Sequence, residues 1–109
     1  MGLPAGVRPY RRTETFTEAT VPKGLLRAHA TGAGVWALIH VEAGHLAYRI
    51  TDPRRPGCER LLTPATSVGV IEPGVLHEVE PLGPVRFYVE FHRLGGDLGP
   101  GERPRGPPR

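Results

Sequence analysis

The chain has 109 residues, the length of a single domain, which leaves little room for separate cofactor and substrate domains. The formal net charge is +3, but residues 13–93 carry eight basic and nine acidic side chains and are therefore nearly neutral. Because a nucleic-acid-binding domain needs a clustered basic face, we expect no nucleic-acid partner. Cys58 is the only cysteine and no segment is apolar enough to cross a bilayer, so we expect a cytoplasmic protein without membrane contacts.

Composition predicts three regions along the chain. Residues 1–12 are basic and interrupted by Gly and Pro, which predicts a flexible N-terminal segment. Residues 13–93 hold the alternating apolar pattern of a folded domain. Residues 94–109 are more than half Gly and Pro, and they are predicted to form a disordered tail.

Apolar and polar residues alternate with period two at short intervals, which is typical of an all-β sandwich or barrel. The alternation predicts eight strands, at residues 13–18, 25–29, 35–41, 45–51, 59–62, 67–72, 75–80 and 85–92. Ala43-Gly44 is predicted to be a tight hairpin and Glu72-Pro73-Gly74 a sharp turn, because Gly tolerates a positive φ. Short strands without helical crossovers predict a double-sheet jelly roll.

Two histidines are predicted to point into the interior. His29 ends a predicted strand just before the strand at residues 35–41, and His77 shares a strand face with Val75 and Val79. Such imidazoles are either core histidines bonded to backbone carbonyls or the nucleus of a divalent-metal site for Zn, Fe or Ni. The residues alone leave both interpretations open.

The strand at residues 85–92 alternates strictly between an apolar and a polar face. Either the polar face is exposed to solvent, or the apolar face packs under another element and the polar face lines a cavity. In the second interpretation Glu90 is the third metal ligand, and Arg86 and Tyr88 contact a bound ligand. Trp36 is then either a core residue or part of the pocket wall.

Several segments together resemble a known family. They are His29-Ala30-Thr31, Gly34-Val35-Trp36, the Gly44 hairpin, Val70-Ile71-Glu72-Pro73, His77 and residues 85–93. As a set they resemble the cupin superfamily and, more narrowly, the TehB/YeaR-like domain associated with tellurite-resistance proteins. The resemblance extends over residues 13–93.

This resemblance implies a cupin-like double-stranded β-helix, that is, a small conical β-barrel of the jelly-roll type that binds one divalent metal. It carries over His29 and His77 as metal ligands, with Glu90 as the third. The implied role is a stress-related site for a small molecule or oxyanion, with no catalytic residue assigned and enzymatic activity left open. The alternative is a metal-free barrel that binds a small molecule between Trp36, Tyr88 and the histidines. We also expect a homodimer, because so small a core gains stability when one sheet face is covered.

Overall fold

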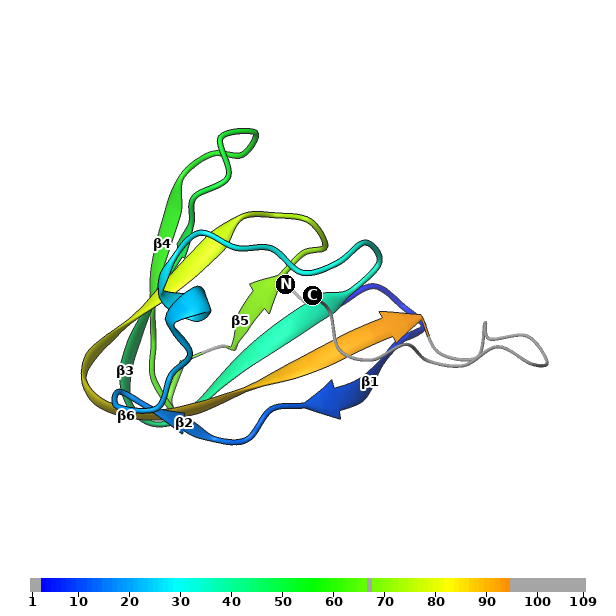
Figure 1. Cartoon of the computed structure of the whole chain (residues 1–109). Helices are drawn as coiled ribbons and strands as arrows, with labels where there is room; N and C mark the ends of the chain where they lie inside the picture. The colour runs from blue at the N-terminus through cyan, green and yellow to red at the C-terminus, as the bar shows by residue number, and fades with distance from the viewer. Residues whose placement is uncertain (1–2, 67, 95–109) are drawn as a thin grey trace.

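The computed structural model describes residues 3–66 and 68–94 (Figure 1). Within these ranges the protein is all-β, apart from one short 3₁₀ helix, η1 (Lys23–Leu26). The strands are β1 (Val7–Arg12), β2 (Phe16–Thr17), β3 (Trp36–Ile50), β4 (Cys58–Leu62), β5 (Gly69–Ile71) and β6 (His77–Leu94). No helix in these ranges is long and apolar enough to span a membrane.

The six strands form one antiparallel sheet in the order β1-β6-β3-β4, with β2 also paired to β6 and β5 to β3. The two long strands β3 and β6 pair from Trp36 opposite His92 to Ile50 opposite His77. The all-β prediction is therefore confirmed. The sheet does not close on itself within the described residues, so the closed cupin jelly roll is not shown.

The hairpin predicted at Ala43-Gly44 is wrong, because β3 continues through it. The pairing of β3 with β6 is irregular on both sides of Gly44, whose φ is +81°. Such bulges bend a strand without ending it. A Cβ atom on Gly44 would lie 2.0 Å from the carbonyl oxygen of Pro84, so the two backbones can approach here only at a glycine. Four predicted strands thus merge into two, and the sheet folds over at this bend (Figure 1).

The N-terminal part also differs from the prediction. Residues 7–12 form β1 instead of a flexible segment, because they pair with β6 and the Arg93 guanidinium lies 4.3 Å from the Tyr10 ring centroid. The predicted strand at residues 25–29 is wrong as well, because its apolar Leu25 reaches the core from a 3₁₀ turn. The predicted tail lies outside the described residues except for Leu94, which ends β6.

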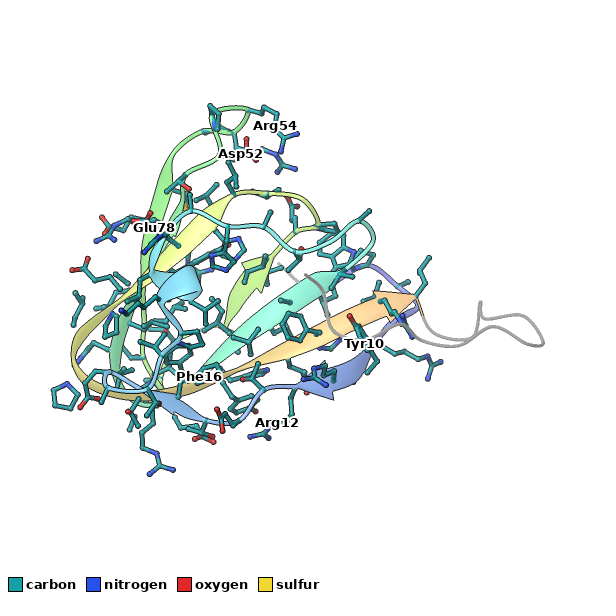
Figure 2. The ribbon with its side chains drawn as sticks, viewed as in Figure 1. Tyr10, Arg12, Phe16, Asp52, Arg54 and Glu78 are labelled. Carbon is teal, nitrogen blue, oxygen red and sulfur yellow. The ribbon has the colours of Figure 1, made fainter. Side chains whose placement is uncertain are left out.

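Residues 18–35 connect β2 to β3, and we call them the strap. The strap contains η1 and crosses the open side of the bent sheet, where it is drawn in light blue (Figure 1). The core lies beneath it, between the two halves of the sheet. The buried core comprises Phe16, Ala37, Ile39, Leu46, Tyr48, Leu62, Ile71, Val79, Val85, Phe87 and Val89. Figure 2 shows Phe16 extending from β2 into this interior.

Candidate functional site

A cavity of about 520 Å³ lies between the strap and the inner side of the sheet. Most of its lining is apolar and comes from β3, β5, β6 and the strap, for example Ile39, Val79 and Phe87. The polar side chains in the lining are Thr13, His29, Thr31 and His77. The cavity is therefore a hydrophobic space with a small number of polar groups, the composition usual for small-molecule sites.

The structure brings His29 and His77 together, as predicted for two inward imidazoles. His29 lies in the strap, and His77 begins β6 with only 1% of its surface exposed. The two residues exchange backbone hydrogen bonds, with both N···O distances at 2.9 Å. Their ring centroids are 4.1 Å apart. The strap is thus joined to the sheet at the residues that place two imidazoles in the cavity wall.

Both rings are oriented by the same kind of hydrogen bond. Nδ1 of His29 donates to the carbonyl oxygen of Arg27, and Nδ1 of His77 donates to that of Val75, each at 2.9 Å. A carbonyl oxygen can only accept, so Nδ1 carries the proton in both rings. These are the carbonyl contacts expected of core histidines, yet they leave Nε2 as a lone-pair acceptor in each neutral ring.

Burial keeps the imidazole of His77 uncharged at neutral pH. Desolvation lowers its pKa to about 4, while the hydrogen bond to Val75 opposes this shift and the neighbouring His29 adds to it. The ring of Tyr48 packs edge-on against His77, with centroids 6.1 Å apart. Burial raises the pKa of Tyr48 to about 12, and its hydroxyl donates to the carbonyl of Val70 at 2.9 Å. Tyr48 therefore supports the histidine as a neutral packing partner.

Asp52 positions the turn that precedes His77, and the sequence reasoning missed it. Its buried carboxylate accepts hydrogen bonds from the backbone N–H groups of Arg54 and Leu76 at 2.9 and 3.1 Å. The Arg54 guanidinium donates to Asp52 and, at 2.8 Å, to the carbonyl of Gly74 (Figure 2). These hydrogen bonds hold the pKa of Asp52 well below its usual range. The available signal was an Asp at the start of a turn, where its side chain commonly caps the backbone two residues on.

The turn held by Asp52 is the one predicted at Glu72-Pro73-Gly74, and it is confirmed. Gly74 has a φ of +72°, and the N–H of Val75 donates to the carbonyl of Glu72 at 3.4 Å. Pro at the second position and Gly at the third suit this turn geometry. The turn thus places His77 at the start of β6.

Glu90 does not join the two histidines. Val89 and Phe91 line the cavity, so Glu90 between them projects from the opposite side of β6. There its carboxylate accepts a hydrogen bond from Nε2 of His92 at 2.8 Å, and Nε2 of His40 lies 3.5 Å away. The interpretation in which the polar face of this strand lines the cavity is thus wrong, because burying the apolar face removes far more hydrophobic surface from water.

The same alternation places the predicted ligand-binding residues outside the cavity. Arg86 is exposed, and Tyr88 stacks on His40 with ring centroids 4.7 Å apart. The guanidinium of Arg12 lies 3.8 Å from the centroid of the Tyr88 ring. Trp36 is half-buried opposite His92 on this outer side. None of Arg86, Tyr88 and Trp36 lines the cavity.

The donor set does not fit a three-ligand metal centre. Two imidazoles line the cavity, and none of the residues in its lining is a carboxylate or a cysteine. Over residues 3–66 and 68–94, no group of three or more His, Cys, Asp or Glu is spaced to hold a metal ion. Protein metal sites of the kind implied by the resemblance use at least three protein ligands.

Residues 11–89 match the family model of the TehB-like domain. The chain belongs to the TehB-like domain family. The tellurite-resistance family named in the resemblance is thus confirmed, whereas membership of the wider cupin superfamily is not shown. No curated protein matches the sequence.

Two solved structures share the fold of this TehB-like domain. The crystal structure of TehB from Haemophilus influenzae has a TM-score of 0.76 and 22% identity, covering 83% of this chain and 32% of that chain. The crystal structure of a protein from E. coli (strain K12) has a TM-score of 0.73 and 20% identity, covering 84% of this chain and 95% of that one. This chain thus spans about a third of the length of the Haemophilus TehB. At these identities the similarity shows the fold alone.

Proposed function

We propose that this TehB-like domain is a binding module for a small, largely apolar molecule. The observation that carries the proposal is a hydrophobic cavity of about 520 Å³ with two fixed imidazoles in its wall. This volume lies within the range of roughly 300 to 1,000 Å³ that is common for small-molecule pockets.

Preorganisation of the histidine pair supports this function. The backbone hydrogen bonds between His29 and His77 and the carbonyl contacts of both Nδ1 atoms hold the rings in place before any ligand binds. A site whose polar groups are already ordered loses less conformational entropy on binding. The strap supplies Leu25 and Pro22 to the lining, so a bound ligand would contact this segment as well as the sheet.

In this proposal the TehB-like domain binds a small molecule and does not form a metal centre. The cavity supplies two of the three protein ligands that such a centre uses, and no step is assigned to a metal. We place the domain in the cytoplasm, because the exposed Cys58 suits a reducing compartment.

Filling the cavity tests this function. Ala37 is fully buried and lines the cavity, so Ala37→Leu puts a larger side chain into the space that a ligand would occupy. We expect ethylbenzene to bind the full chain, with chemical-shift changes at the cavity residues, and to bind Ala37→Leu at least about tenfold more weakly. Ala43→Leu on the exposed part of the same strand is the matched control and should bind normally.

Circular dichroism confirms that the variants fold, and metal content measured on the same samples tests the competing function. An equal affinity of Ala37→Leu and wild type would contradict binding in the cavity. Stoichiometric metal that is lost in folded His29→Ala and His77→Ala would overturn the proposal in favour of a metal site on the histidine pair.

A further inference from the structure

The donor hydrogens of the polar side chains in the cavity lining already form hydrogen bonds within the protein. The hydroxyl of Thr13 donates to the carbonyl of Glu14, and that of Thr31 donates to the carbonyl of Val35, each at 2.7 Å. The Nδ1–H groups of His29 and His77 donate to backbone carbonyls at 2.9 Å. Among the side chains that line the cavity, all of them in the described ranges, no donor is left for a ligand.

Hydrogen-bond acceptors in the cavity lining remain available to a ligand. The Nε2 atom of an uncharged imidazole carries a lone pair, and the two rings lie 4.1 Å apart between their centroids. Thr13 Oγ1 already accepts a hydrogen bond from the N–H of Val89 at 3.0 Å, and its second lone pair can accept another. The side chains of the cavity thus offer acceptors and hydrophobic contact only.

Such a cavity discriminates against anions. A carboxylate, a phosphate or another oxyanion brings acceptors and negative charge, and the lining holds no Lys or Arg to compensate the loss of its hydration. Burying a charge without a partner is among the most costly steps in binding. A neutral molecule with an O–H or N–H group loses less hydration and gains a hydrogen bond to Nε2.

We infer that the ligands of this cavity are neutral, largely apolar molecules that carry a hydroxyl or amino donor, and that free oxyanions are excluded. The inference rests on the proposed function and names the ligand class of the same site. It replaces the expectation of an oxyanion, which was based on the resemblance to tellurite-resistance proteins. The low pKa of His77 supports it, since that ring stays a hydrogen-bond acceptor at neutral pH.

A matched series of ligands tests the inference on the full chain at pH 8. The four probes are 4-ethylphenol, 4-ethylanisole, 4-ethylbenzoate and ethylbenzene, which share a hydrophobic body and differ in one group. We expect 4-ethylphenol to bind about tenfold more tightly than its methyl ether, because only the phenol can donate to Nε2. We expect no saturable binding of 4-ethylbenzoate.

Variants assign the effect to the histidine pair. Each of His29→Phe and His77→Phe removes one of the two Nε2 acceptors and should reduce the advantage of the phenol over the ether, and the double variant should abolish it. Ethylbenzene should still bind, because the cavity remains apolar. His29 is only partly buried, so His29→Phe retains a folded protein if His77→Phe does not. His45→Phe changes an exposed histidine outside the cavity and should leave all four affinities unchanged.

The outcomes separate the two claims. Equal affinities for the phenol and the ether, with ethylbenzene bound, would overturn the ligand class and leave the proposed function intact. Preferential binding of 4-ethylbenzoate would also overturn the ligand class. If none of the four probes binds, the ligand class fails together with the proposed function.

Discussion

His77 is a buried imidazole that the fold keeps neutral, and this links stability to pH. Its pKa is lowered to about 4 in the folded protein, compared with about 6.5 in an unfolded chain. Between these values the unfolded chain binds a proton that the folded protein does not. The stability that the neutral His77 contributes is therefore fully present above about pH 6.5 and is lost as the pH falls toward 4.

From these two pKa values we expect the free energy of unfolding to fall by about 2 kcal/mol between pH 7.5 and pH 5. Urea unfolding at both pH values measures the change, and His77→Gln should remove most of it. His45→Gln is the control, because His45 is exposed. The same pH dependence in folded His77→Gln and wild type would contradict this role. Asp52 acts at lower pH, since its pKa lies below the usual range of a carboxyl group.

At the scale of elements, the bend shared by β3 and β6 creates the cavity, because it folds the sheet over the core. The sequence predicts a positive φ at Gly44, and this is confirmed. A hairpin turn and a β-bulge can both require a positive φ, so this feature alone does not distinguish them. The continuation of β3 becomes visible only when its pairing with β6 on both sides of Gly44 is known. Local alternation locates strand segments and does not tell whether two of them are joined.

We predict that Gly44→Ala destabilises the protein by at least about 2 kcal/mol, through the strain of a positive φ and the collision with Pro84. Gly57→Ala is the matched control, because a Cβ at Gly57 meets nothing within 4 Å. Its stability should stay within about 0.5 kcal/mol of the wild type. Thermal and urea unfolding of both variants provide the comparison. Wild-type stability in Gly44→Ala would show that the close approach at the bend is not required.

For the whole molecule, the homodimer remains a prediction. One sheet and its strap enclose a core of modest size, and a chain this short buries only about 60 to 65% of its unfolded surface. Half-buried Trp36 and Tyr88 lie on the outer side of the sheet, away from the cavity. We expect analytical ultracentrifugation at micromolar concentration to give twice the chain mass of 11.8 kDa. A single species at the mass of one chain would contradict this expectation.

The sequence by itself determined the all-β class, the turn at Glu72-Pro73-Gly74 and the inward direction of His29 and His77. These features depend on residue order over a few positions, where period-two alternation and the conformations of Pro and Gly act directly. The resemblance to the TehB-like family was also evident from these segments.

The tertiary structure decided which face of β6 lines the cavity, and so placed Glu90 with His92 instead of with His77. It also brought Asp52 to the turn before His77 and laid the strap across the sheet. The local sequence of an alternating strand is compatible with either of its faces lining the cavity. The choice between them follows from the total hydrophobic burial against β2, β3 and the strap, which are distant in sequence.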